Sequence, residues 1–525
     1  MNRKSRSANM DKKQIGKLFI IGYQGEEPSE EFLSFVKEWG IGGVIVFARN
    51  LSDPLLLPDR LKKIEQAAGC KIFTAIDQEG GLVLRILSQG SLFPSAMALS
   101  ATGDPKLAEE TYRAIGEEMA ALGLNWNLAP VLDINHPRNP GIGARSFGDT
   151  PERVAEYGIP AIRGLQSAGV MACAKHFPGK GDAQKDSHLT LPVIPYSAER
   201  LHAVELLPFK KAIENNVAAI MTSHVFFPAF EKEENLPITL SKSVLTDLLR
   251  KELGYKGLLI TDDLEMGAIT ESFGIAQAAL RSFMAGADQL LICHTLEQQR
   301  LAAESVLAEV EKNPEAVRRL KESLERIAEA RKLISKANTS ASISELHKKH
   351  TSLIEKVSAK SIKFLSFSGK DLPVKNTPDT MFVLPQISAL VQVEEDHKDK
   401  SLANIVLAEF PQTATVVYDP KAEKQDILQQ INKTGNPSDV VFMTYNGHLF
   451  RNQLDAARDL SIAGKNVIVI ALRNPYDLFE CDFANTKGAT FGFRTPAIKA
   501  MLDVLKGETV PTVDGWPVKT INAVA

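Results

Sequence analysis

Residues 170–188 read Val-Met-Ala-Cys-Ala-Lys-His-Phe-Pro-Gly-Lys-Gly-Asp-Ala-Gln-Lys-Asp-Ser-His. An apolar run typical of a strand leads directly into a glycine-containing loop that is rich in lysine, aspartate and histidine. A surface connection needs turn residues but has no use for so many titratable groups, and loops carry function when a rigid scaffold holds them. The stretch therefore predicts a strand whose C-terminal end belongs to a functional site.

The same pattern, a short apolar run followed by a helix-period segment, recurs through the first 300 residues. Eight runs are strand candidates, at 18–23, 42–47, 71–76, 125–131, 170–174, 217–222, 257–261 and 288–292. Representative helices are expected over 106–122, 152–166, 198–215 and 243–252. Because alternating strands and helices imply parallel pairing through crossover helices, we expect an α/β fold of the TIM-type (β/α)8 barrel class. Its active site would lie at the C-terminal ends of the strands.

A second α/β layered domain is expected after the barrel. The helical pattern from Leu296 to Lys336 is interrupted near Asn313-Pro314, and the next residues are polar and serine-rich. We expect the barrel at 1–336, a linker at 337–360 and the second domain at 361–525. Its expected strands are 380–384, 413–418, 439–445, 466–472 and 489–493, and its expected helices are 421–432, 452–463 and 496–505. Three arginines of this domain are interpreted as ordinary surface residues: Arg451, Arg473 and Arg494.

Polar side chains follow five of the eight barrel strands. These residues are Asp77, Asp133, Lys175 with His176, His224, and Asp262 with Asp263. A helix cap or a turn aspartate explains any one of them, and we keep that interpretation for Asp263. Caps do not require a lysine-histidine pair, so the joint pattern favours a rim that binds a ligand.

Five motifs in register resemble those of one known family. They are Ile-Asp-Gln-Glu-Gly-Gly at 76–81, Ala-Pro-Val-Leu-Asp at 129–133, Gly-Ala-Arg-Ser-Phe-Gly at 143–148, the loop at 175–188, and Ile-Thr-Asp-Asp-Leu at 260–264. Along residues 15–335 the chain resembles glycoside hydrolase family 3, in its β-N-acetylglucosaminidase branch of cell-wall recycling. Two positions depart from the family's usual pattern: Lys180 stands where histidine is common, and Leu82 where arginine is common.

The resemblance implies an activity and a set of site residues. It implies a retaining exo-β-N-acetylglucosaminidase that acts on N-acetylglucosamine-containing cell-wall fragments through a covalent glycosyl-aspartate intermediate. Asp262 would be the nucleophile, and Asp186 with His188 would form a dyad whose histidine is the general acid/base. The sugar-binding residues implied are Asp77, Arg145, Lys175 and His176, with Asp133 and His224 as further lining residues.

The side chains themselves suit that chemistry. A retaining glycosidase needs a carboxylate on one face of the anomeric carbon and a proton donor on the other, about 5–5.5 Å apart when both are carboxyl groups. Asp262 can be the carboxylate if cations such as Lys175 or Arg145 keep it ionised. His188 changes protonation near neutral pH, and Asp186 can fix its tautomer.

Other interpretations of the same residues remain open. His176, His188, His224 and Asp262 could be assembled into a metal site, but the spacing matches no metal motif and nearby lysines would repel a cation, so no metal or cofactor is expected. Lys175 alone would suit a Schiff-base aldolase, and Arg145 a simple salt bridge. Asp186 and His188 alone would suit a turn with an exposed histidine.

The whole chain leaves three further functional alternatives. They are a non-catalytic carbohydrate sensor on the same barrel, a broader β-glucosidase, and a phosphorylase. The last arises because a neutral imidazole beside the anomeric carbon does not repel phosphate as a carboxylate would.

The net charge and the apolar segments of the sequence indicate which partners and which location to expect. The 525 residues carry a net charge of −3, which gives no reason to expect nucleic acid or an acidic membrane as partner. The apolar run at 18–23 is too short for a signal-peptide core, so a cytoplasmic protein is expected. The sequence leaves the oligomeric state open.

Overall fold

The computed structural model describes residues 11–183, 191–334, 341–389 and 401–519. The chain forms two compact units, each assembled from three stretches. The first contains Met1–Gln78, Arg113–Pro130 and Ile162–Leu346, and the second contains Glu79–Tyr112, Val131–Ala161 and His347–Ala525. Most of the stretch expected to be a linker is helical, because helix α13 spans Ile343–Ser361. The boundaries 1–336, 337–360 and 361–525 stay a prediction.

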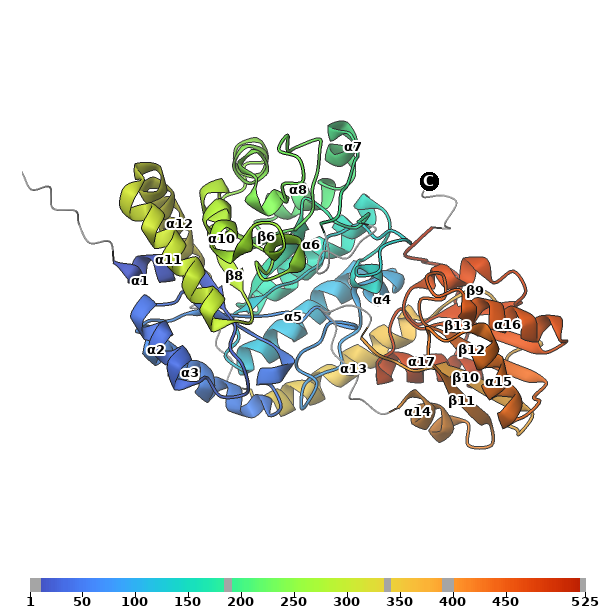
Figure 1. Ribbon diagram of the computed structural model, residues 1–525. Coiled ribbons are helices and arrows are strands. Elements are labelled where there is room, and N and C mark those ends of the chain that lie inside the picture. The colour runs from blue at the N-terminus through green and yellow to red at the C-terminus, as the bar shows by residue number, and fades with distance from the viewer. Residues whose placement is uncertain (1–10, 184–190, 335–340, 390–400, 520–525) are drawn as a thin grey trace, which may run out of the picture. The chain divides into compact units, whose positions relative to one another are not determined.

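The first unit is built on an eight-stranded parallel sheet that closes into a barrel (Figure 1). Its strands are β1 (Phe19–Ile21), β2 (Gly43–Val46), β3 (Phe73–Ile76), β4 (Trp126–Asn127), β5 (Met171–Phe177), β6 (Ala219–Thr222), β7 (Leu258–Ile260) and β8 (Leu290–Ile292). The order β7-β6-β5-β4-β3-β2-β1-β8 is closed by a parallel bridge between Ile260 and Gln289. All eight expected strands are present, so the predicted barrel is confirmed.

Helices alternate with these strands as expected. They are α1 (Lys12–Gly16), α2 (Glu30–Trp39), α3 (Leu57–Ala68), α4 (Ala96–Ala101), α5 (Pro105–Ala121), α6 (Pro151–Ser167), α7 (Ala198–Ala203), α8 (Leu207–Glu214), a π-helix at Ser243–Glu252, α9 (Gly267–Thr270), α10 (Gly274–Ala285), α11 (Leu296–Lys312) and α12 (Pro314–Ile334). The break expected near Asn313-Pro314 is found between α11 and α12. The single helix expected over 198–215 is wrong, because the chain there forms α7 and α8 separately.

Helix α2 illustrates how local sequence sets these elements. The Ser29 hydroxyl accepts a hydrogen bond from the Phe32 backbone N–H and so caps the first turn. Phe32, Phe35, Val36 and Trp39 repeat at helical spacing and are all buried. Gly40 then adopts a left-handed conformation, with φ of 58°, which ends the helix.

Strand β5 is longer than the sequence indicates. It runs to Phe177, so Lys175 and His176 belong to the strand and do not follow it, contrary to the expectation that it ends at residue 174. The Lys175 backbone N–H donates to the Pro130 carbonyl at 3.2 Å, which continues the pairing with the preceding stretch. Both side chains are buried. Polar residues usually mark the end of a buried strand, and the partner that allows Lys175 to be buried, Asp77, lies far away in sequence.

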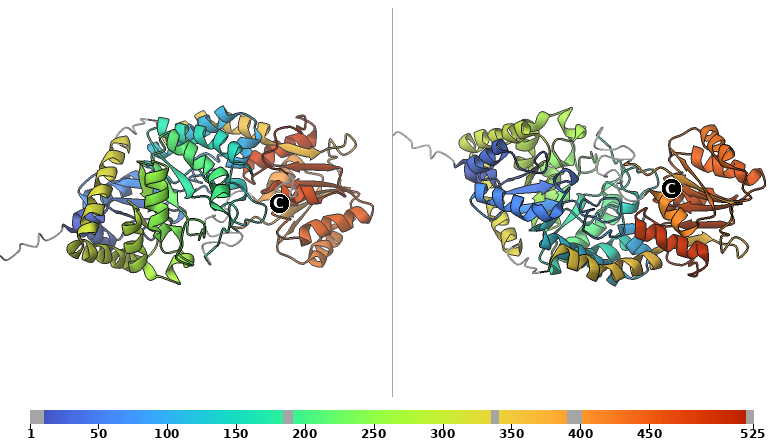
Figure 2. Two further views of the ribbon diagram at one scale, coloured as in Figure 1. Left: turned by 90° about the horizontal axis from the view of Figure 1, so that it is seen from above. Right: turned by 90° about the horizontal axis from the view of Figure 1, so that it is seen from below.

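The second unit contains a six-stranded mixed sheet in the order β11-β10-β12-β13-β14-β9. Its strands are β9 (Lys363–Ser366), β10 (Thr380–Pro385), β11 (Ala414–Tyr418), β12 (Asp439–Thr444), β13 (Asn466–Ala471) and β14 (Thr486–Ala489). Its helices include α14 (Leu402–Glu409), α15 (Lys424–Thr434), α16 (Asn452–Ile462) and α17 (Thr495–Lys506). Helices α14 and α17 pack together on one face of the sheet, and α15 and α16 on the other (Figure 2).

The predicted second α/β domain is confirmed, with two differences. The last strand was expected at 489–493, but β14 ends at Ala489. The antiparallel edge strand β9 was not expected, because its four residues lie directly after the long helix α13 and carry no separate turn signal.

A buried ionic cluster holds the base of the first unit's sheet together. Asp288, just before β8, is fully buried and accepts hydrogen bonds from Arg250 at 2.5 Å, Arg319 at 2.7 Å and Arg326 at 3.0 Å. Burial alone would raise the pKa of Asp288, but the three guanidinium groups more than offset it and hold the pKa below its ordinary value of 3.8. The cluster links the π-helix, β8 and α12.

We expect Asp288→Asn to lower the free energy of unfolding by about 3–5 kcal/mol, because it removes the buried anion that the three guanidinium groups share. A lowered pKa means that the contribution of Asp288 is complete above about pH 4 and is lost as the pH falls further. The difference between wild type and variant should therefore shrink in acid. Thermal and urea unfolding followed by circular dichroism measures both effects.

The matched control is Asp247→Asn, which removes the exposed ion pair with Lys251. It should change the free energy of unfolding by less than about 0.5 kcal/mol. Equal stability losses in the two variants would contradict the assignment.

In the described parts of the chain, no helix combines the length and the apolar character that crossing a bilayer requires.

Candidate functional site

Asp262 lies two residues beyond the end of β7, at the C-terminal rim of the barrel. Its Oδ1 accepts a hydrogen bond from the Asp263 backbone N–H at 2.9 Å, and its Oδ2 lies 3.5 Å from the Nζ of Lys180. The Asp262 side chain is 15% exposed and that of Lys180 is 10% exposed. A backbone N–H therefore orients the carboxylate, and a cation faces it at a site that is largely shielded from water. These conditions would suit a nucleophilic carboxylate.

Lys180 supplies a cation beside Asp262, which the sequence did not predict. Lys175 and Arg145 are expected to keep this carboxylate ionised, and that role stays a prediction for both. Lys180 was noted in the sequence only as a departure from the family's usual histidine. At this position an ammonium group supplies a positive charge where a neutral imidazole would not.

Lys175 and Asp77 form an ion pair across two strands of the barrel. The Nζ of Lys175, on β5, donates to Oδ1 of Asp77, directly after β3, at 2.6 Å. The Lys175 side chain is 2% exposed and that of Asp77 is 13% exposed. An ammonium group held by a carboxylate donates hydrogen bonds and does not attack a carbonyl, which favours a binding role over a Schiff-base role.

The remaining residues of this rim are buried. His176 follows Lys175 in β5, and its carbonyl accepts from the Gly179 backbone N–H at 2.8 Å. His224, two residues beyond β6, is fully buried, and its ring nitrogens lie within hydrogen-bond distance of Thr239 and of the Asp263 carbonyl. The structure thus brings Asp262, Lys180 and His224 to neighbouring strand ends. Asp186 and His188 lie outside the described residues.

Arg145 and Asp133 belong to the second unit. Arg145 forms a bidentate ion pair with Glu79, in which Nε donates to Oε2 and Nη2 donates to Oε1, both at 2.8 Å. Both side chains are buried. Its Nη1 also donates to the Gly141 carbonyl at 3.0 Å. Asp133 is fully buried, and its carbonyl accepts from the Ser146 hydroxyl at 2.6 Å. The ion-pair interpretation of Arg145 is correct for its contact with Glu79, and its contact with sugar stays a prediction.

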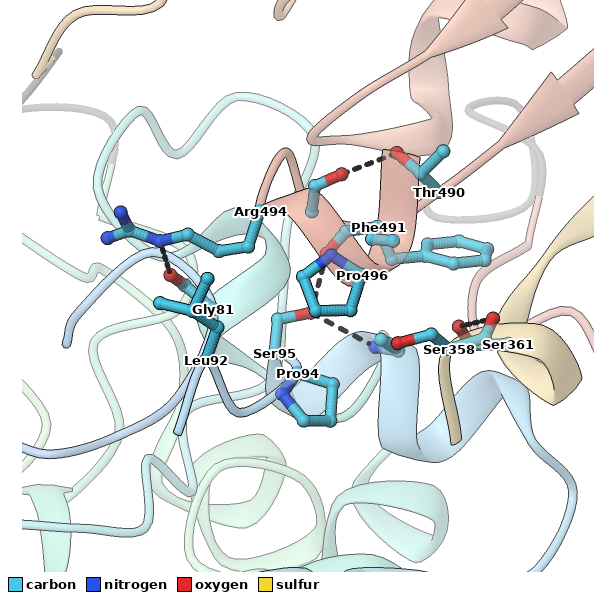
Figure 3. A pocket seen from close by; sticks show the side chains of 13 residues that line it. Gly81, Leu92, Pro94, Ser95, Ser358, Ser361, Thr490, Phe491, Arg494 and Pro496 are labelled. Carbon is cyan, nitrogen blue, oxygen red and sulfur yellow. Dashed lines mark hydrogen bonds between the residues drawn. The ribbon is translucent and has the colours of Figure 1, made fainter. Parts of the chain in front are cut away.

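The second unit holds a small pocket (Figure 3). Its free volume of about 10 Å³ is roughly that of a single water position. The Ser95 hydroxyl donates to the Phe491 carbonyl at 2.5 Å, and Nε of Arg494 donates to the Gly81 carbonyl at 3.0 Å. A pocket this small does not accommodate a sugar ring.

Two arginines of the second unit were misjudged from the sequence. Arg473 is fully buried and Arg494 is 3% exposed, so neither is a surface residue, whereas Arg451 is exposed and pairs with Glu480. Buried arginine is rare unless paired, and its partners cannot be found from local sequence.

A second aspartate-histidine pair, His448 with Asp477, was also missed. Nδ1 of His448 lies 2.6 Å from Oδ1 of Asp477, and its Nε2 lies 3.1 Å from the Pro137 carbonyl. Both ring nitrogens contact protein groups, so the pair has a structural role. Among the described residues, no group of three or more metal-ligating side chains is gathered.

Comparison with known proteins assigns the family. The model of the N-terminal domain of glycosyl hydrolase family 3 matches residues 10–330. The chain belongs to glycosyl hydrolase family 3. That match covers the whole barrel, including the motifs that carry the resemblance, and the prediction of a glycoside hydrolase is confirmed.

Relatives within family 3 are named β-hexosaminidases. The β-hexosaminidase A of Pseudoalteromonas piscicida is 36% identical over 283 residues, which are 50% of this chain and 47% of that protein. The match thus spans about half the length of that relative. The β-hexosaminidase of Neisseria meningitidis serogroup C is 34% identical over 261 residues, which are 48% of this chain and 72% of that protein.

A solved structure extends the family 3 likeness to almost the whole chain. The family 3 β-N-acetylglucosaminidase of Paenibacillus sp. str. FPU-7 is 35% identical, with a TM-score of 0.91, and the match covers 98% of this chain and 100% of that chain. A fungal multi-domain family 3 β-N-acetylglucosaminidase is 30% identical, with a TM-score of 0.88 and 61% of that chain covered. The expected resemblance to the β-N-acetylglucosaminidase branch is confirmed.

Proposed function

We propose that this family 3 protein is a retaining exo-β-N-acetylglucosaminidase that works through a covalent intermediate on Asp262. The observation that carries the proposal is the likeness, over 98% of the chain at 35% identity, to a structure described as a family 3 β-N-acetylglucosaminidase. The oriented Asp262 carboxylate supports it, because Oδ1 accepts from a backbone N–H and Oδ2 faces Lys180.

The proposed reaction has two steps. In the first, the Asp262 carboxylate attacks the anomeric carbon while His188 protonates the glycosidic oxygen, so the bond to the aglycone breaks and the alcohol leaves. In the second, His188 removes a proton from water, which attacks the anomeric carbon and restores Asp262. Asp186 would keep the imidazole in the required tautomer.

Sugar binding is assigned to the polar residues of the rim. Lys175 and Asp77 form a fixed donor and acceptor pair, suited to the hydroxyl groups of one sugar. The same role is proposed for His176, Arg145 and Asp133. We further propose that the substrates are N-acetylglucosamine-containing cell-wall fragments and that the protein acts in the cytoplasm.

The test is a screen of the purified full-length protein against aryl glycosides of N-acetylglucosamine, N-acetylgalactosamine and glucose. We expect the N-acetylglucosaminide to react fastest, the β-anomer to form first, and chelators to leave the rate unchanged. A fluorinated mechanism-based sugar should label the peptide that contains Asp262. Initial release of the α-anomer, or a label on another residue, would contradict the mechanism.

A phosphorylase is the second candidate, and the contact between Lys180 and Asp262 favours it. The ammonium group faces a negative charge in the resting protein. Esterification of Asp262 removes that charge, so the positive potential beside the anomeric carbon rises when the acceptor must enter. An anion such as phosphate would be attracted at this stage.

We therefore expect sugar 1-phosphate to form beside the hydrolysis product when the protein turns over in phosphate. Lys180→Gln should reduce its formation by at least about tenfold, and by more than it reduces hydrolysis, since loss of the cation affects an anionic acceptor most. Product analysis in phosphate and in a non-anionic buffer of equal ionic strength measures both rates. No sugar phosphate at high phosphate concentration would leave hydrolysis as the reaction.

A further inference from the structure

Buried side chains hold the dipeptide Asp262-Asp263 at both of its ends. The Asp262 backbone N–H donates to Oγ1 of Thr222 at 3.3 Å. At the other end, the Asp263 carbonyl oxygen lies 2.8 Å from Nε2 of His224. Thr222 is the last residue of β6 and His224 follows two positions later, so one strand end supplies both contacts.

Thr239 joins these two contacts into a ring. Its Oγ1 lies 2.8 Å from Oγ1 of Thr222 and 2.9 Å from Nδ1 of His224. Thr222, His224 and Thr239 are each fully buried. The Thr239 hydroxyl also lies 2.9 Å from the Ser223 carbonyl, a second acceptor for the same hydrogen.

The acceptors in this ring determine where its hydrogens lie. A carbonyl oxygen only accepts, so Nε2 of His224 carries a hydrogen and donates to Asp263. Burial lowers the pKa of His224, against the smaller opposing effect of the Asp262 charge, and this favours the neutral ring. Nδ1 then has a lone pair that faces the Thr239 hydroxyl, whose single hydrogen the Ser223 carbonyl also accepts.

The contacts therefore link the Asp262 amide through Thr222, Thr239 and His224 to the Asp263 carbonyl. Linked hydrogen bonds in a buried setting polarise one another and strengthen the whole set. The ring fixes the backbone on both sides of the Asp262 side chain. A displacement of about 1 Å at a reacting group can reduce the rate about 100-fold.

We propose that His224 is a positioning residue that orients Asp262 through Thr239 and the Asp263 carbonyl, and that it does not contact the sugar. The inference rests on the proposed function, because it takes Asp262 as the nucleophile. It replaces the lining role that the resemblance implies for His224. A fully buried imidazole with a protein group at each ring nitrogen has no polar atom to offer a ligand.

The first test compares His224→Met with His224→Gln in the full-length protein. The methionine variant should lower kcat for an aryl N-acetylglucosaminide about 10- to 100-fold, with KM changed less than about threefold, because the nucleophile is misplaced but the sugar contacts remain. The glutamine amide can donate to the Asp263 carbonyl, so kcat of the glutamine variant should be at least about tenfold higher than kcat of the methionine variant. A raised KM with kcat retained would overturn the proposal in favour of a sugar contact.

The second test moves to Thr239, so the proposal stays falsifiable if His224 variants fold poorly. Thr239→Val removes the hydroxyl at nearly constant volume and should slow the burst phase in which the intermediate forms. Thr239→Ser keeps the hydroxyl and should exceed the valine variant by at least about threefold. Equal burst rates in the two variants would overturn the proposal.

A labelling control separates this inference from the proposed function. If the fluorinated sugar labels Asp262 in the wild type but the variants keep full kcat, the positioning role alone is wrong. If the wild type is not labelled at Asp262, the proposed function fails and the inference fails with it.

Discussion

Asp262→Asn is expected to fold normally and to lose turnover by a factor of about 10³ or more, because no carboxylate remains to attack the anomeric carbon. The asparagine amide can still accept from the Asp263 backbone N–H, so the loop should keep its shape. Measurement of kcat/KM on an aryl N-acetylglucosaminide, with circular dichroism to check folding, gives the result.

The neighbouring carboxylate provides a matched control. Oδ1 of Asp263 accepts from the backbone N–H groups of Glu265 and Cys293, at 3.1 and 3.2 Å. Asparagine keeps that oxygen, so Asp263→Asn should reduce kcat/KM by no more than about tenfold. Full activity in Asp262→Asn, or equal losses in the two variants, would show that Asp262 is not the nucleophile.

His188→Ala is expected to give the second largest effect, and its size should depend on the leaving group. Substrates with sugar or alkyl leaving groups should lose about 10²- to 10⁴-fold, because their oxygen needs a proton as the bond breaks. For activated aryl glycosides the rate of bond cleavage should fall much less, because a low-pKa phenolate leaves without protonation. A plot of log kcat/KM against leaving-group pKa should therefore be steeper for the variant.

Two further variants sharpen this experiment. Asp186→Asn should show the same trend more mildly, because the histidine remains but its orientation is weakened. His202→Ala, at a partly exposed histidine that contacts Glu252, should leave the slope as in the wild type. Equal losses across the whole leaving-group series would mean that His188 holds the loop or the sugar and transfers no proton.

Much of the barrel was predictable because a buried parallel strand needs a continuous apolar run. All eight runs became strands, and Asp77, His224 and Asp262 lie just beyond the ends of β3, β6 and β7. Strand β5 was mispredicted at its end because Lys175 and His176 are polar yet buried. The partner of Lys175 is Asp77, which lies 98 residues away along the chain, so local sequence gives no sign of the pairing.

The site was predictable only in part, for the same reason. Asp262 is identified by its strand end and motif, but its contact with Lys180 depends on how the loop after β5 folds back. Thr239 lies in Leu-Pro-Ile-Thr-Leu, a stretch with no functional pattern, and becomes part of the site only through its contacts with Thr222 and His224. Glu79 was visible within the motif at 76–81, yet its pairing with Arg145 required the structure.

The buried cluster at Asp288 has a consequence for how the protein is made. Two of its three arginines, Arg319 and Arg326, are on α12, which follows the last barrel strand in sequence. While the ribosome has synthesised β8 but not yet α12, Asp288 has only Arg250 to neutralise it and is costly to bury. We therefore expect the segment from the π-helix to β8 to be more protease-sensitive in a nascent chain stalled once β8 has left the exit tunnel than in one stalled once α12 has left it.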